Sequence, residues 1–157
     1  MKLFVYGTLR KGGDFSQYLP EGRKITLCQL EGVLMYNLGY YPGCRITGKK
    51  EDVVVGEVND FEGLLSQEEW ENLIGIMDRI EGVANGLFDR STTETPYGEA
   101  IIYTISDKTL KRVTDDKDFE LQVLTDWAEV NMDVADMVPT LNKEKDNVTF
   151  RAKEQKE

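Results

Sequence analysis

Apolar and polar positions in the first sixty residues follow the short period of β-strands. A strand is predicted for residues 2–6, where Gly7 ends the apolar run and opens a glycine-containing loop. A longer β-like run covers residues 24–36, with Gly32 as a bend or bulge inside it. Residues 52–58 predict a further strand. This half of the chain therefore favours a sheet.

The pattern changes to a helical period between residues 67 and 81. Ser66 is suited to the N-cap position, and Glu69 completes a capping box three residues later. The apolar residues recur every three or four positions and form one stripe. They are Trp70, Leu73, Ile74, Met77 and Ile80.

The second half returns to strands and ends in another expected helix. Residues 88–95, a turn at 96–98 and residues 99–105 give a hairpin signal. An amphipathic helix is predicted for residues 118–133. Its apolar face would hold Phe119, Val123, Trp127 and Val130. Because strands and helices do not alternate regularly, the order predicts an α+β fold with a mixed, mostly antiparallel sheet that can roll into a small barrel flanked by helices.

Length and composition place these elements in one domain. The 157 residues suffice for a single core, which we assign to residues 1–141, with residues 142–157 as a charged, loose tail. No segment has the ~20 apolar residues of a membrane helix. The two cysteines, Cys28 and Cys44, suit reduced thiols better than a disulfide, so we expect a cytoplasmic protein.

Charge and residue usage exclude several classes of chemistry. A formal net charge of −10 argues against nucleic acid, which requires a basic surface. The chain has no histidine, which excludes Ser-His-Asp and Cys-His catalysis and histidine zinc sites. Proton transfer must therefore come from Asp, Glu, Lys, Tyr or Cys.

Glu81 is the carboxylate whose position departs most from the pattern around it. At about 100° per residue it lies roughly 20° from Trp70, near the middle of the apolar stripe. A carboxylate turned inward has its pKa raised toward neutrality, as a general acid/base requires. Alternatively, Gly82 caps the helix and Glu81 turns into solvent. The pattern alone leaves both readings open.

The loop after the first strand gives a second signal. A strand that ends in Tyr6-Gly7-Thr8-Leu9 can leave backbone N–H groups unpaired, and such groups suit a carboxylate or carbonyl oxygen. An ordinary turn explains the glycine equally well.

Together, and in this order, these segments resemble the γ-glutamylcyclotransferase-like superfamily, which includes γ-glutamylamine cyclotransferases and AIG2-like proteins. The resemblance spans about residues 2–105. It rests on Val5-Tyr6-Gly7-Thr8-Leu9-Arg10, Tyr41-Pro42-Gly43, Val55-Gly56-Glu57-Val58 and Met77-Asp78-Arg79-Ile80-Glu81-Gly82, followed by Arg90 and the strand from Ala100 to Tyr103.

The resemblance implies a mixed β-barrel and a cofactor-free, metal-free reaction. In that reaction the α-amine of a γ-glutamyl group attacks its own γ-carbonyl, which yields 5-oxoproline and a free amine. Glu81 would be the catalytic acid/base, and the partner would be a small γ-glutamyl molecule. The implied substrate-binding residues are Tyr6, Gly7, Thr8, Leu9, Tyr41, Arg90 and Tyr103. The oligomeric state stays open.

Three positions depart from the family pattern. Phe88 stands where many relatives have tyrosine, Phe15 where asparagine is frequent, and Ile80 where an aromatic residue is usual. Two lost polar groups predict a drier pocket that prefers γ-glutamyl groups on neutral amines over glutathione. The alternative is a binding module on the same fold without turnover. A metal-dependent acidic hydrolase is disfavoured, since no Asp/Glu cluster has ligand spacing.

Overall fold

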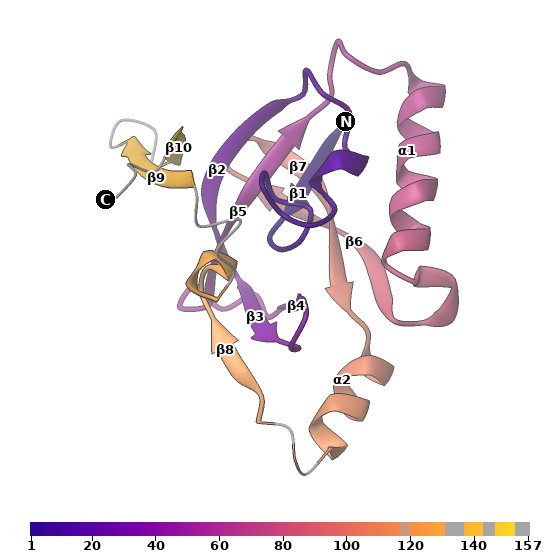
Figure 1. The fold of residues 1–157 in the computed structure, drawn as a ribbon, viewed down its shortest axis with the longest axis vertical. Helices are drawn as coiled ribbons and strands as arrows, with labels where there is room; N and C mark the ends of the chain where they lie inside the picture. Colours follow the sequence, from indigo (N-terminus) through magenta and orange to yellow (C-terminus); the bar gives the residue numbers. More distant parts are fainter. Residues whose placement is uncertain (117, 119, 131–136, 143–146, 153–157) are drawn as a thin grey trace.

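The computed structural model describes residues 1–116, 118, 120–130, 137–142 and 147–152. Within this part of the chain, eight strands form one curled mixed sheet in the order β2-β5-β1-β7-β4-β3-β8, and β6 pairs with β7 (Figure 1). Parallel pairing joins β7 to β1 and to β4, and the other pairs are antiparallel. The predicted α+β fold with a mixed, mostly antiparallel sheet is confirmed. The strands are β1 (Lys2–Val5), β2 (Lys24–Glu31), β3 (Val33–Asn37), β4 (Pro42–Ile46), β5 (Val53–Asp60), β6 (Phe88–Thr95), β7 (Gly98–Ile105) and β8 (Gln122–Leu124).

Most of the expected strands form where the pattern placed them. The run from residue 24 to 36 divides at Gly32, whose φ is +81°, into β2 and β3. The expected hairpin is β6 and β7, paired from Phe88–Ile105 to Thr95–Gly98. Short 3₁₀ turns at Ser16–Tyr18, Val83–Asn85 and Trp127–Glu129 connect other elements.

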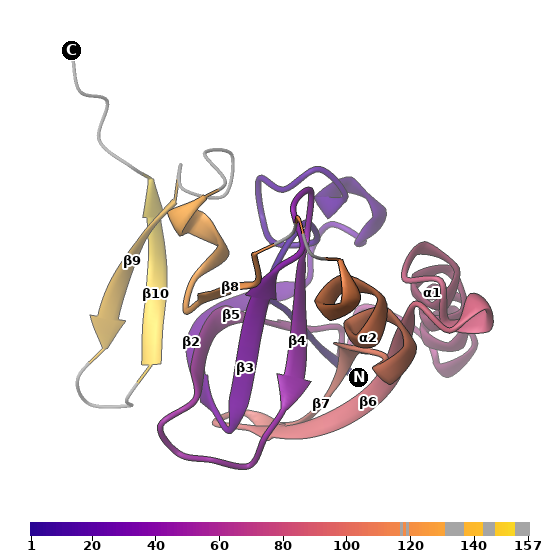
Figure 2. The ribbon, with the colours of Figure 1, turned by 90° about the horizontal axis from the view of Figure 1, so that it is seen from below.

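Two helices lie on one side of the curled sheet (Figures 1 and 2). Helix α1 (Gln67–Ile80) begins as predicted, because Ser66 and Glu69 form both bonds of the capping box. Helix α2 (Asp107–Asp115) begins at Ser106, whose side chain accepts the N–H of Thr109. The sequence analysis did not predict α2, a short segment whose apolar residues are only Leu110 and Val113.

The core has two parts because β1 is buried on both faces. Leu3 and Val5 pack toward α1, together with Leu73 and Met77. Phe4 and Tyr6 point to the other face and pack into the interior of the curl. Their neighbours there include Cys28, Leu30, Met35, Val54, Ile102 and Trp127. The alternation along β1 therefore places its C-terminal end between the two clusters.

The helix predicted for residues 118–133 is wrong. Residues Gln122–Leu124 form β8 instead, which pairs with β3. Trp127 is buried while Val123 is 54% exposed, so the apolar residues do not share one face. Cross-strand pairing with β3 prevails over the weak helical period. Phe119 and residues 131–133 lie outside the described residues.

The segment expected to be a charged tail contains a strand. β9 (Met137–Asn142) and β10 (Asn147–Ala152) pair in an antiparallel two-stranded sheet. The hairpin lies beside β2, on the side away from the helices (Figures 1 and 2). The proposed domain boundary at residue 141 stays a prediction.

Candidate active site

One cavity of about 270 Å³ lies where β1, β4, α1, β6 and β7 meet. The end of β1 and its loop form one wall, and the C-terminal end of α1 forms another. The lining residues are Phe4, Val5, Tyr6, Gly7, Thr8, Leu9, Phe15, Tyr41, Pro42, Ile80, Glu81, Leu87, Phe88 and Tyr103. Segments far apart in the sequence therefore meet here, and among them are all the site residues expected from the sequence except Arg90.

Glu81 reaches the cavity from the end of helix α1. The helix ends at Ile80, and Glu81 is its C-cap residue with φ −82° and ψ −3°. The N–H of Glu81 still donates to the carbonyl of Met77 at 2.9 Å, so the residue keeps the direction of the apolar stripe. Gly82 then turns the chain in the left-handed conformation, with φ +66°. The helix therefore ends before Gly82, as one interpretation of the sequence predicted. The carboxylate nevertheless lines the cavity, as the other interpretation predicted.

Burial raises the pKa of the Glu81 carboxyl to about 7. The side chain is partly buried, and loss of hydration is the cause of the shift. Burial also raises the pKa of Tyr6 and of Tyr103, and the nearby charge of Glu81 contributes less to each. The two phenols therefore stay protonated at neutral pH, while Glu81 can exchange a proton there.

The loop after β1 is a turn whose inner amides are unused. The N–H of Arg10 donates to the carbonyl of Gly7 at 2.9 Å. Within the described part of the chain, no acceptor is found for the N–H groups of Thr8 and Leu9. A turn of this kind leaves the amides of its two central residues free for a ligand. Both residues line the cavity.

Gly7 is required because the turn packs directly on the start of β4. A Cβ atom at Gly7 would lie 2.5 Å from Cγ of Pro42. The Tyr-Gly-Thr-Leu and Tyr-Pro-Gly segments therefore pack directly against each other. Tyr41, next to Pro42, reaches the cavity and is 38% exposed.

The hydroxyl of Tyr6 forms its hydrogen bonds with backbone groups. It donates to the carbonyl of Tyr103 on β7 at 2.6 Å and accepts the N–H of Cys44 on β4 at 3.3 Å. Tyr6 therefore joins β4 to β7 beside the cavity. Its ring lines the cavity, but its hydroxyl is already bonded.

Arg90 does not line the cavity. Its guanidinium forms an ion pair with Asp78 at 3.2 Å, and Asp78 accepts the hydroxyl of Tyr103 at 2.7 Å. Arg90 is 47% exposed. It therefore lies behind the cavity wall and can affect the cavity through Asp78 and Tyr103.

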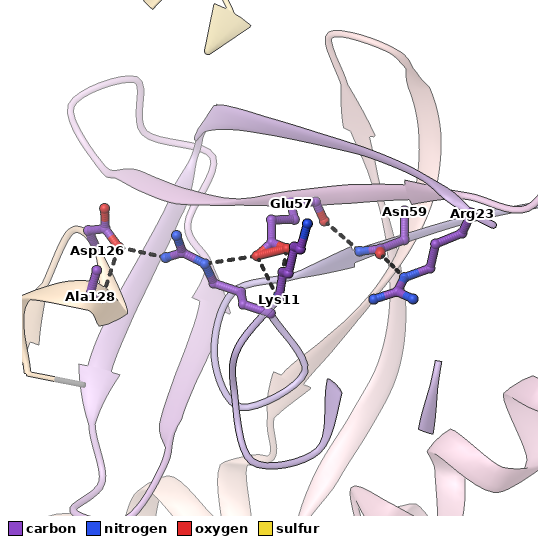
Figure 3. A network of polar contacts seen from close by, with 7 residues as sticks. Lys11, Arg23, Glu57, Asn59, Asp126 and Ala128 are labelled. Atoms are coloured by element: carbon purple, nitrogen blue, oxygen red, sulfur yellow. Dashed lines mark hydrogen bonds and ion pairs between the residues drawn. The ribbon is translucent and has the colours of Figure 1, made fainter. Parts of the chain in front are cut away.

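A buried ion-pair network anchors the end of the loop to β5, and the sequence analysis did not predict it (Figure 3). Arg10 donates to Glu57 at 3.1 Å and to Asp126 at 2.6 Å. The N–H of Lys11 donates to Glu57 at 2.9 Å. The side chains of Arg10 and Glu57 are each 1% exposed. The available signal was a glutamate inside the apolar run of residues 53–58, which requires a buried partner.

The described residues contain neither a metal-ligand cluster nor a membrane-spanning helix. No group of three or more His, Cys, Asp or Glu side chains among them could hold a metal ion. None of the helices in this part of the chain is long and apolar enough to cross a membrane.

Comparisons with known proteins agree on the family and the fold. A family model described as Gamma-glutamyl cyclotransferase, AIG2-like, matches residues 3–128. The gamma-glutamylcyclotransferase family protein YtfP of Escherichia coli K12 is 28% identical over 103 residues, which cover 66% of this chain and 80% of that protein.

Two solved structures have a similar fold. The crystal structure of the uncharacterized protein PH0828 from Pyrococcus horikoshii superposes with a TM-score of 0.58 at 24% identity and covers 84% of this chain and 93% of that one. The solution structure of E. coli ytfP superposes with a TM-score of 0.53 at 23% identity and covers 81% and 94%. At such identities these structures support the fold alone.

Proposed function

Because the chain belongs to the Gamma-glutamyl cyclotransferase, AIG2-like family, we propose that it converts a γ-glutamyl amine or γ-glutamyl amino acid into 5-oxoproline and a free amine. The observation that carries the proposal is Glu81, a carboxyl with a pKa of about 7 in a cavity beside unused backbone amides. A small γ-glutamyl molecule is the proposed partner.

The reaction needs one group that first takes and then returns a proton. The α-amine of the substrate forms a bond to its own γ-carbonyl carbon, and the amide bond to the leaving amine breaks. Glu81 takes the proton from the attacking nitrogen and delivers it to the departing nitrogen. Its pKa of about 7 allows both transfers near neutral pH.

The loop would hold the other end of the substrate. The N–H groups of Thr8 and Leu9 suit the α-carboxylate of the γ-glutamyl group. A carboxylate fixed there limits the rotations of the glutamyl chain and brings the amine toward the γ-carbonyl. Ring closure then benefits from proximity.

The test is release of 5-oxoproline from γ-glutamyl amines, γ-glutamyl amino acids and glutathione. The purified protein is expected to release 5-oxoproline from at least one of them, in an amount equal to the amine released. Binding of these compounds without release from any would contradict the cyclotransferase proposal and favour a binding module.

The pH profile of kcat/KM is a second prediction. Because the free carboxylate of Glu81 is the base, kcat/KM should rise with pH and level off above about 7. Initial rates between pH 5 and 9 at low substrate concentration measure it. A profile without an ionisation between about pH 6 and 8 would remove Glu81 as the base.

We also propose a cytoplasmic location. Cys28 and Cys44 are both free and buried in the interior of the sheet. Free thiols are expected where the compartment is reducing.

A further inference from the structure

Three aromatic side chains line the cavity, and two of them, Phe15 and Tyr41, are partly exposed. Tyr41 and Phe88 pack with their ring centroids 5.9 Å apart. Phe15 is 40% exposed, and its N–H donates to the carbonyl of Thr8 at 2.9 Å. All three line the same cavity as Glu81. The region beside the catalytic carboxyl is therefore apolar and partly open.

The charges around this region also bear on which leaving group it can bind. None of the residues that line the cavity is a lysine or an arginine, and Glu81 is the one Asp or Glu among them. Arg90, the cation that the sequence suggested for the site, is paired with Asp78 outside it. A second carboxylate bound here would have no cation as partner.

We propose that this aromatic region selects an uncharged, apolar leaving group, such as an aromatic or branched aliphatic amine, and that Phe15, Tyr41 and Phe88 contact it. The proposal rests on the proposed cyclotransferase function and names the substrate class for the same cavity. The substrate class is then γ-glutamyl amides of neutral amines.

The free energies of transfer favour this leaving group over a charged one. An amino-acid leaving group brings a carboxylate whose burial without a partner costs several kcal/mol. It would also lie near Glu81 and repel its ionised form. A cationic leaving group would lower the pKa of Glu81 and weaken it as a base. A phenyl or branched alkyl group instead buries apolar surface against the three rings.

The size of the cavity is compatible with a small substrate. Its volume of about 270 Å³ lies just below the range of about 300–1,000 Å³ found for drug-sized ligands. A single γ-glutamyl group with one small amine suits such a cavity better than a peptide.

The experiment compares kcat/KM for four substrates: γ-glutamyl-benzylamide, γ-glutamyl-alanine, glutathione and γ-glutamyl-putrescine. The wild-type protein is expected to favour the benzylamide by at least ~10-fold over each of the others, since an unpaired buried charge costs more than 1.4 kcal/mol. Equal values for the benzylamide and γ-glutamyl-alanine would overturn the proposal. So would a preference for γ-glutamyl-putrescine, which would make the rings a site for a cation.

A charge in the aromatic region provides the matched variant. Phe15→Arg places a cation where the leaving group enters, and it should raise the ratio of γ-glutamyl-alanine to benzylamide turnover by about 10-fold. Tyr18→Arg is the control, because Tyr18 is 49% exposed, packs beside Phe15 and does not line the cavity. An unchanged ratio in folded Phe15→Arg, or an equal change in Tyr18→Arg, would contradict the assignment.

Failure of the reaction and failure of the aromatic region give different results. If none of the four substrates yields 5-oxoproline, the cyclotransferase proposal fails. Calorimetry with γ-glutamyl-benzylamide and γ-glutamyl-alanine then tests the aromatic region by affinity alone. Binding of the benzylamide at least ~10-fold tighter supports the region, and equal or undetectable binding of both overturns it.

Discussion

Glu81→Gln is expected to lower kcat for 5-oxoproline release by at least ~100-fold. Glutamine has nearly the same shape as glutamic acid but cannot take up a proton from the attacking amine. The variant should therefore still bind the substrate. Stopped-time assays of 5-oxoproline at pH 8, with the substrate that the screen identifies, measure the effect.

The same variant should be more stable than the wild-type protein at alkaline pH. The pKa of Glu81 is raised from an ordinary carboxyl value to about 7, so its contribution to stability is present at acid pH and is lost as the pH rises to about 7. A glutamine side chain does not ionise and avoids this loss, which amounts to about 3 kcal/mol in the free energy of unfolding at pH 8. A group whose ionisation costs stability but permits catalysis is typical of active sites.

Glu68→Gln is the control for both measurements. Glu68 lies on the exposed face of α1 and does not line the cavity, so the same chemical change there should leave kcat within about twofold and stability within about 1 kcal/mol. Near-normal turnover in Glu81→Gln would show that another group transfers the proton.

The sequence predicted those features of the site that depend on neighbouring residues, and not those that depend on contacts between distant segments. The stripe on α1 and the cap at Ser66 are local, and they predicted the helix and made an inward-facing Glu81 one of two interpretations. The turn after β1 could also be predicted, because a strand that ends at Gly7 is a local pattern. The contact of this turn with Pro42 could not be predicted, since it depends on how β1 and β4 lie beside β7.

Contacts between distant segments explain where the structure departs from the sequence pattern. The apolar residues between 119 and 130 fit a helical period, but β8 gains its hydrogen bonds from β3, more than eighty residues earlier. Arg90 fitted the family spacing, yet its guanidinium is drawn to Asp78 on α1 and away from the cavity. In both cases a tertiary partner decided the outcome over a local pattern.

The Arg10 network could not be predicted either, because its members are far apart in the sequence. Arg10 and Glu57 are 47 positions apart, and Arg10 and Asp126 are 116 apart. A charged residue in an apolar segment signals that a partner exists, but it does not identify the partner. The network ties the loop after β1 to β5 and to the chain after β8 (Figure 3).

Arg10→Met is expected to lower the free energy of unfolding by about 3–5 kcal/mol. Methionine fills part of the space but leaves the carboxylate of Glu57 buried without its cation, in a site where burial already raises its pKa. The loop would also lose its bond to Asp126, the link to the chain after β8. Urea denaturation followed by fluorescence measures the change.

Two further variants separate the lost ion pair from simple loss of an arginine. Arg23→Met is the control, because Arg23 is partly exposed and donates only to neutral oxygens, Oδ1 of Asn59 and the carbonyls of Leu19 and Pro20 (Figure 3). Its loss leaves no charge buried and should cost about 1–3 kcal/mol. Adding Glu57→Gln to Arg10→Met removes the unpaired charge while keeping an acceptor for the N–H of Lys11. The double variant should therefore recover at least about 1 kcal/mol of the loss. Equal costs for Arg10→Met and Arg23→Met, with no recovery in the double variant, would show that the buried charge of Glu57 is not what makes Arg10 necessary.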